Sequence, residues 1–174
     1  MNKFVFFILL FLILFSCEEK KSKQQQRINP EKLVEPLKKF NQEMISVEDR
    51  QIDDYLLRRN WKMNRSKSGL RWVIYKEGSG MTFRIGQIVE LKYVIRLIRG
   101  DEVYNSEKDG VKRFRVDQSE EIAGLHELVQ YLKVGDKCQA VIPSYLAYGL
   151  IGDEKRIPKK ATLFFDVQLM KILD

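Results

Sequence analysis

Apolar and polar residues alternate most clearly between residues 87 and 98, in the segment QIVELKYVIRLI. A period of two residues is typical of a β-strand that has one buried face. Shorter segments of the same kind, LRWVIYKEG, KRFRV, KCQAVIP and ATLFFDVQLMKIL, predict further strands, and Gly100-Asp101 predicts a turn. In the first segment, the residues expected on the buried face are Val89, Leu91, Tyr93, Ile95 and Leu97.

A helical spacing interrupts these strands in EEIAGLHELVQYLKVGDK, at residues 120–137. Apolar residues at intervals of three and four indicate an amphipathic helix, and Gly135 stands near its expected end. We expect His126 on the polar side of this helix, pointing to solvent. Several strands around a single helix imply an α+β domain whose antiparallel sheet packs on that helix. The residues expected to point inward are Ile122, Leu125, Val129 and Leu132.

A second helical pattern occupies residues 33–64. Ser46 is the expected N-cap of a helix in SVEDRQIDDYLLRRN, because Glu48 and Asp49 would then lie in its first turn. Two interpretations stay open: the helix packs on its own domain, or it binds a partner or a second copy of the chain. The modest apolar stripe favours the first. That stripe is formed by Ile52, Tyr55 and Leu56.

The first residues predict an export signal, because MNK supplies one positive charge and the apolar run FVFFILLFLILF follows it. Residues 4–15 are short for a transmembrane helix, which needs roughly 20 residues, so a secretory signal is favoured over an uncleaved anchor. The end of the run, LFSC, resembles a bacterial lipobox. That resemblance implies cleavage before Cys17 and lipidation of this residue; the alternative is a free thiol in a discarded signal. Several acyl chains would hold the protein firmly on a membrane.

These patterns divide the chain into four parts. The segment EEKKSKQQQRINPEK has no apolar period and is typical of a flexible tether. The expected parts are a signal peptide at residues 1–16, a polar tether from lipidated Cys17 at 17–32, a helical extension at 33–68 and an α+β domain at 69–174.

Charge and cysteine content narrow the possible partners. The net charge of +7 suits either nucleic acid or an anionic lipid surface. The basic residues are spread along the chain, so we expect a solvated surface and no nucleic-acid partner. Cys138 is the only cysteine besides Cys17 and is expected to be a buried, inert thiol. Because His126 is the only histidine, we expect neither a metal site nor a cofactor.

Residues 69–174 resemble the FKBP-type peptidyl-prolyl cis-trans isomerases. The resemblance rests on the order and spacing of VELKYVIRLIRGDEVYNS, IAGLHELVQYLKVGDK and IPSYLAYGLIGDEKRIPKKATLFFDVQL. It implies the FKBP fold, a five- to six-stranded antiparallel half-barrel wrapped around one short helix. The lipobox and the helix expected before the α+β domain are similar to those of the gliding-motility-associated FKBP lipoproteins.

The resemblance also implies a concave aromatic pocket for a proline ring. In it, the Tyr148 hydroxyl and the backbone N–H of Ile157 would hold substrate carbonyls. Taken singly, inward aromatic residues are more often core than site, so the prediction depends on the whole set. The predicted site consists of Tyr93, Tyr104, Asn105, Leu125, Tyr148, Ile157 and Phe165.

Three matched positions depart from the family pattern. Asn105 stands where the family usually has an aspartate, Leu125 where many members have a tryptophan, and Lys112 where an aromatic residue is common. These changes bear on the catalytic rate and on macrocycle affinity more than on the fold.

Two functions follow from these expectations. The first is a lipid-anchored prolyl isomerase at the outer membrane, facing the periplasm, whose clients are proline-containing envelope polypeptides, including those of a gliding machinery. Glu18 after Cys17 favours the outer membrane by resemblance to other lipoproteins, and the acidic pair Glu18-Glu19 leaves export to the cell surface open. The second is an FKBP-fold chaperone or scaffold with little turnover, which the changes at Asn105 and Lys112 keep open. Turnover of a short proline peptide distinguishes the two.

Overall fold

The computed structural model describes residues 30–173. The predicted signal peptide, Cys17 and most of the predicted tether lie outside the described residues. The chain separates into two units, residues 1–38 and residues 39–174, and the described part of the first is helical. Among the described residues, no helix combines the length and the apolar composition needed to cross a bilayer.

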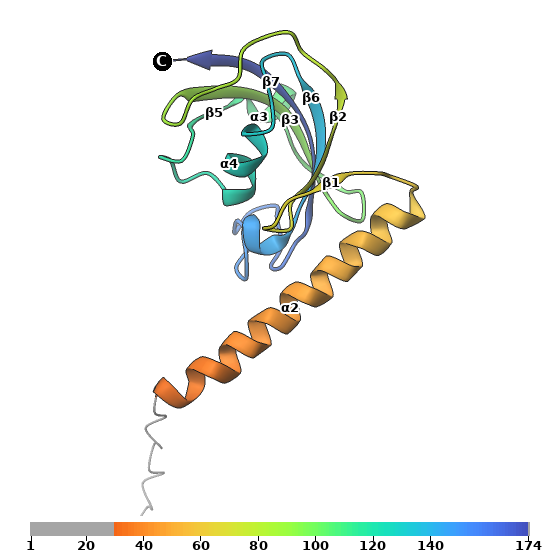
Figure 1. Cartoon of the computed structure of the whole chain (residues 1–174), viewed down its shortest axis with the longest axis vertical. Coiled ribbons are helices and arrows are strands. Elements are labelled where there is room, and N and C mark those ends of the chain that lie inside the picture. The colour runs from red at the N-terminus through yellow and green to blue at the C-terminus, as the bar shows by residue number, and fades with distance from the viewer. Residues whose placement is uncertain (1–29, 174) are drawn as a thin grey trace, which may run out of the picture. The chain divides into compact units, whose positions relative to one another are not determined.

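The described part of the chain begins with a long helix, continues with four strands and then alternates short helices with strands (Figure 1). A single turn of 3-10 helix, η2, follows the sixth strand. In sequence the elements are α2 (Pro30–Arg58), β1 (Asn64–Arg65), β2 (Arg71–Lys76), β3 (Ile88–Leu97), β4 (Glu102–Asn105), α3 (Ser106–Asp109), β5 (Lys112–Arg115), α4 (Ala123–Val129), β6 (Lys137–Ile142), η2 (Ser144–Leu146) and β7 (Leu163–Leu173).

Within residues 30–173, seven strands form one antiparallel sheet in the order β1-β2-β6-β7-β3-β4, and β5 also pairs with β3. Tyr93 of β3 lies opposite Val167 of β7, and Ile95 lies opposite Phe165. Opposite residues of antiparallel strands share a face, so the two alternating patterns form one buried surface. Helix α4 lies against the concave side of this sheet (Figure 1). The predicted α+β half-barrel around a short helix is confirmed.

Helix α4 is shorter than predicted from residues 120–137. After Val129 the chain tightens into turns in which each N–H bonds the carbonyl three residues earlier, ending with Leu132 on Val129 at 3.1 Å. Gly135 then takes a φ of +95°, which ends the helical course. The tighter turns keep Leu132 buried, which is why the apolar period extends beyond the helix.

The prediction that His126 points to solvent is wrong. Its side chain is 9% exposed, and its ring packs edge-on against Phe114 of β5 with centroids 5.1 Å apart. The segment after β5 folds over this side of α4, and the backbone N–H of Asp117 donates to Nδ1 at 3.1 Å. Helical spacing identifies the side facing the sheet but cannot show that a loop covers the opposite side.

Ser46 is not an N-cap, because α2 begins at Pro30 and continues through it. The Ser46 hydroxyl donates to the carbonyl of Glu43 at 2.9 Å instead. The N-terminal boundaries also differ from those expected, since α2 starts within the predicted tether and β1 falls within the predicted helical extension.

The second half of α2 packs on the outer face of the sheet, in residues assigned to the unit 39–174. Ile52, Tyr55 and Leu56 form a separate buried cluster with Val141 of β6 and Phe164 of β7. These strand residues alternate with the inward ones, so the sheet is buried on both sides here. Of the two interpretations left open for this helix, the structure shows packing on its own domain. The expected start of the domain at Gly69 thus lies well inside the observed unit.

Candidate functional site

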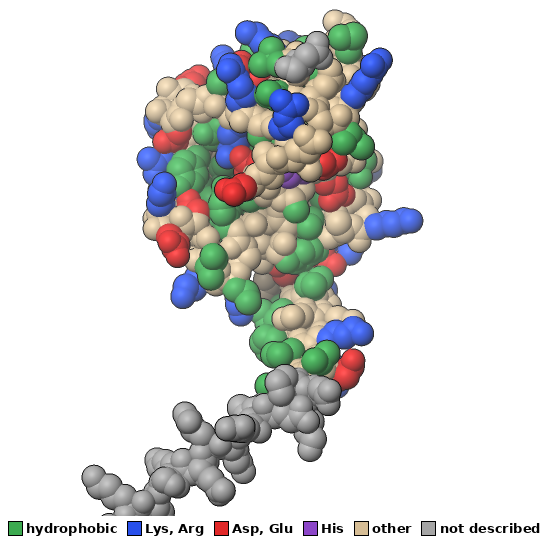
Figure 2. Space-filling view, turned by 90° about the vertical axis from the view of Figure 1, so that its left-hand side faces the viewer, with side chains coloured by type: hydrophobic (Ala, Val, Ile, Leu, Met, Phe, Trp, Pro, Cys, Tyr) green, Lys and Arg blue, Asp and Glu red, His purple; other side chains and the backbone are tan. Residues whose placement is uncertain are grey.

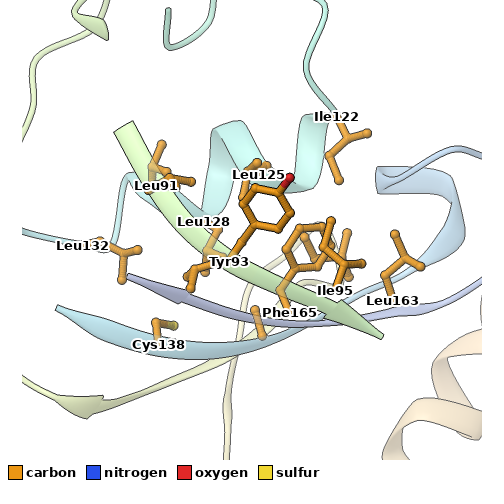
Figure 3. Close-up of a cluster of buried hydrophobic side chains, with 14 of the residues drawn as sticks. Leu91, Tyr93, Ile95, Ile122, Leu125, Leu128, Leu132, Cys138, Leu163 and Phe165 are labelled. Carbon is orange, nitrogen blue, oxygen red and sulfur yellow. The ribbon is translucent and has the colours of Figure 1, made fainter. Parts of the chain in front are cut away.

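The floor of the candidate site is built by one aromatic residue from β3 and one from β7. Tyr93 is 6% exposed, and Phe165 is fully buried. Both side chains extend from the sheet toward α4, which contributes Leu125 (Figure 3). The structure therefore brings these three predicted site residues together, among aliphatic side chains that exclude water.

A glycine sets the depth of α4 on the sheet. A Cβ atom at Gly124 would lie 2.4 Å from Cγ2 of Ile142 and 3.1 Å from the carbonyl oxygen of Leu146. The first distance is too short for any real side chain, so another residue here would push α4 away from β6. Gly124 thus fixes the position of its neighbour Leu125 at the floor.

Tyr104 forms one wall and is tied to the long loop between β6 and β7. Its hydroxyl donates a hydrogen bond to the carboxylate of Asp153 in that loop. The Arg156 guanidinium lies over the Tyr104 ring, 4.7 Å from its centroid. Partial burial and the Asp153 carboxylate raise the pKa of Tyr104 to about 12. The tyrosine is therefore a neutral, oriented wall at physiological pH.

Asn105 follows Tyr104 at the end of β4, and its side chain makes local hydrogen bonds. Its side chain caps the short helix α3 by accepting a hydrogen bond from Glu107 N–H at 2.9 Å. Its amide nitrogen donates to Glu102 at 3.3 Å. Since both ends of the side chain are engaged locally, Asn105 supports the turn after β4, where it lines a small hollow together with Tyr104 and Arg156.

Tyr148 comes from the long loop and is half-buried against the main core. Burial, followed by the negative charges of Glu121 and Asp153, raises the pKa of its hydroxyl. No hydrogen bond of this hydroxyl to another described residue is found. A neutral hydroxyl without a partner in the described structure is a donor that a ligand carbonyl can use.

Ile157 lines the same cluster but differs from expectation in one respect. Its backbone N–H, which the resemblance assigns to a substrate carbonyl, already donates to Oδ1 of Asp153 at 2.7 Å. The same oxygen accepts the N–H groups of Lys155 and Arg156 at 3.0 and 2.9 Å. A substrate carbonyl would therefore have to displace a carboxylate from Ile157.

A pair of charges lies at the edge of the floor. Lys112 of β5 forms a 2.6 Å ion pair with Glu121, and its ammonium is 5.6 Å from the centroid of the Tyr93 ring. The second carboxylate oxygen of Glu121 accepts the N–H of Ile122 at the start of α4. Where the family commonly has an aromatic wall, this chain thus has a cation paired with an acid.

Sequence reasoning missed Asp153, Glu121 and Arg156. Asp153 had a local signal, because aspartate after a glycine commonly accepts the N–H two residues on in an Asx-turn. No local signal predicts that Glu121 pairs with Lys112 or that Arg156 pairs with Asp109, since each pair joins different segments of the chain.

The assembled site has the chemistry of an apolar binding surface. Burial raises the pKa of Tyr93, as it does for Tyr104 and Tyr148, so all three stay protonated near neutral pH. Among residues 30–173 there is no group of three or more His, Cys, Asp or Glu side chains that could hold a metal ion. The protein's single histidine, His126, is 9% exposed, and a small part of it is visible in purple in Figure 2.

An antiparallel sheet curved around one helix, with aromatic residues gathered between them, is the architecture of the FKBP class. The family model for FKBP-type peptidyl-prolyl cis-trans isomerase matches residues 80–170. The chain belongs to this family.

Named relatives agree with this assignment. The probable FKBP-type isomerase FkpA of Neisseria meningitidis is 41% identical over 105 residues, which cover 60% of this chain and 38% of that protein. The Xenopus laevis peptidyl-prolyl cis-trans isomerase FKBP1A is 36% identical over 55% of this chain and 91% of its own length. The chain spans less than half the length of its FkpA relatives in Neisseria and Buchnera.

Solved structures agree as well. FkpA from Escherichia coli has a TM-score of 0.62 at 27% identity, covering 84% of this chain and 74% of that one. AtFKBP13 has a TM-score of 0.60 at 27% identity, covering 63% of this chain and 98% of that one.

Proposed function

We propose that the protein is a peptidyl-prolyl cis-trans isomerase whose site lies where Tyr104 and Tyr148 border the buried floor of Tyr93, Leu125 and Phe165. The observation that carries the proposal is the water-excluding aromatic floor beside the Tyr148 hydroxyl, which has no partner in the described structure. Rotation about an X–Pro bond crosses a barrier of roughly 18–20 kcal/mol, because amide resonance is lost.

The planar amide is more polar than the twisted one, so a dry floor favours the twisted state. A ten-thousandfold acceleration requires about 5.5 kcal/mol, at about 1.36 kcal/mol for each factor of ten. Apolar contact with a proline ring and one hydrogen bond from Tyr148 supply part of this energy, to the extent that both are stronger in the twisted state. No proton transfer is needed, which fits a site whose tyrosines stay neutral.

The proposed setting is the cell envelope. The lipobox-like LFSC supports export and lipidation of Cys17. Glu18, which follows Cys17 in place of an aspartate, supports the outer membrane by resemblance to other lipoproteins, and the proposed orientation of the domain is toward the periplasm. Proline-containing envelope polypeptides, including components of a gliding machinery, are the proposed clients. Labelled fatty acid should be incorporated by the wild type and not by Cys17→Ser, and a wild type that takes up none refutes the anchor.

A second candidate function is a binding module with little turnover. Three observations favour it: Asp153 occupies the Ile157 N–H, Asn105 is engaged in capping α3, and Lys112 with Glu121 occupies the edge of the floor. The test measures binding and isomerisation of one proline peptide by the full chain. Isomerisation that is much faster than the uncatalysed step, which takes about 10–100 s, supports the enzyme. Binding without acceleration supports the module.

A further inference from the structure

One contact joins the appended helix α2 to the loop that carries Tyr148 and Ile157. Glu48 lies in the second half of α2, outside the residues 80–170 that match the family. Its Oε1 accepts the backbone N–H of Ser144 at 2.6 Å and the hydroxyl of Thr162 at 2.5 Å, and its Oε2 accepts the hydroxyl of Ser144 at 2.8 Å. A carboxylate with three donors at these distances is a strong local link.

The two partners of Glu48 stand at opposite ends of that loop. The last paired residues of β6 and β7 are Ile142 and Leu163. Ser144 follows the first by two residues, and Thr162 directly precedes the second. Glu48 therefore closes the base of the loop 143–162 beyond the last strand pair. Tyr148 and Ile157 both lie between these two ends.

Glu48 is itself held in place by neighbours on the same side of the helix. Asp49 and Asp53 form ion pairs with Arg71 of β2 at 2.7 and 2.8 Å, and Arg71 is 1% exposed. One turn further on, Ile52 is fully buried against the sheet. A glutamate anchored to the sheet on this side is a fixed point, so it can restrain the loop and not merely follow it.

We propose that Glu48 is a positioning residue that holds the base of the site loop, so that α2 sets the placement of Tyr148. Only the expected effect of Glu48 on isomerisation rests on the proposed function. Without the carboxylate, the Ser144 N–H loses its acceptor and the two ends of the loop lose their common partner. The ends then separate more often, and the Tyr148 hydroxyl spends less time where a substrate carbonyl would meet it.

The test compares Glu48→Ala with Asp53→Asn in the full chain. Asp53 lies on the same side of α2 and helps to anchor it to Arg71, but it contacts no residue of the loop. Amide hydrogen exchange follows Gly149 and Lys160, whose N–H groups bond within the loop, to the carbonyls of Ser144 and Gly149 at 2.8 Å. Isomerisation of a proline peptide is measured on the same samples.

We expect Glu48→Ala to speed exchange at Gly149 and Lys160 by about tenfold, the size expected for losing hydrogen bonds to a charged group, while amides of β3 and β7 stay unchanged. The value of kcat/KM should fall with kcat, because the hydroxyl is misplaced in the transition state. Asp53→Asn should change the loop amides and kcat/KM much less than Glu48→Ala does, because Asp49 still pairs with Arg71.

A double-mutant cycle with Thr162→Val adds a second measurement. The exchange effects of Glu48→Ala and Thr162→Val should not add, because both remove the same bond. Loop exchange that is unchanged, or that rises equally across the sheet, overturns the proposal. A wild type without isomerase activity refutes the proposed function alone, since the exchange measurements still decide whether Glu48 restrains the loop.

Discussion

The floor and the edge of the candidate site are built by different forces. The floor residues Tyr93, Leu125 and Phe165 come from regular elements and are held by apolar burial. The edge residues Asp153 and Lys112 are held by hydrogen bonds and ion pairs between segments. Burial depends on shape and resists changes of pH and salt, whereas polar contacts respond to both. The two regions should therefore respond differently to substitution, and the difference can be measured.

The largest effect is expected at the floor. Phe165→Ala should lower the free energy of unfolding by about 3–5 kcal/mol and reduce isomerisation strongly, because it leaves a cavity beneath the proposed proline site. Denaturant unfolding and peptide turnover measure both effects.

Phe164→Ala is the matched control, because Phe164 is buried on the opposite side of β7, in the cluster with α2. It should also destabilise the protein but leave turnover intact below the unfolding transition. Equal loss of turnover in both variants would show that the floor acts only through stability.

At the edge, the largest effect is expected for Asp153→Ala. The change removes the acceptor of three backbone N–H groups and of the Tyr104 hydroxyl, and should cost about 1–3 kcal/mol of stability. Thermal unfolding measures the loss.

The same carboxylate gives a pH dependence with a defined sign. Burial alone would raise the pKa of Asp153, but hydrogen bonds from Tyr104 and from the backbone outweigh it and lower this pKa. A lowered pKa in the folded state adds stability that is complete above the unfolded value of about 3.9 and is lost as the pH falls below it. Asp153→Asn should remove this part of the acid sensitivity; an unchanged acid profile contradicts the assignment.

The contrast between floor and edge also explains what the sequence could predict. Alternation in β3 and β7 identified Tyr93 and Phe165, because burial on one face of a strand leaves a period of two residues. The pairing of Lys112 with Glu121 and the cap made by Asn105 leave no such period. The burial of His126 depends on a covering loop. Contacts of this kind arise only once distant segments have been brought together by the core.

A smaller effect is expected for Tyr148→Phe. Loss of one hydrogen bond to the substrate, about 0.5–1.5 kcal/mol, should lower kcat/KM about two- to tenfold. Stability should not change, because the hydroxyl has no partner among the described residues. Tyr104→Phe should instead lower stability more than kcat/KM, since the Tyr104 hydroxyl bonds Asp153 in the free protein. Unfolding and turnover of the two variants separate substrate contact from loop support.

A still smaller effect is expected from the ion pair of Lys112 and Glu121. Its side chains are 22% and 14% exposed, and a double-mutant cycle with Lys112→Met and Glu121→Gln should give a coupling of about 0.2–1 kcal/mol that weakens with salt. The pair Lys108–Glu102, at 3.2 Å and more exposed, is the control and should give less. A coupling of several kcal/mol would show that this ion pair contributes to stability as strongly as the buried floor does.

The smallest effect concerns pH and His126, where no change is expected. A site that works by apolar contact and one neutral hydroxyl has no group that titrates near neutrality. The tyrosines have raised pKa values, and those of Asp109 and Asp153 are lowered. The profile of kcat/KM should thus be nearly flat between about pH 6 and 8, the range in which a histidine titrates.

His126→Gln should keep this flat profile. The variant should lower stability, because the His126 ring packs on Phe114 and accepts the N–H of Asp117. A bell-shaped profile that disappears in His126→Gln would show that proton transfer takes part, and the distinction between an apolar floor and a titrating edge would then fail.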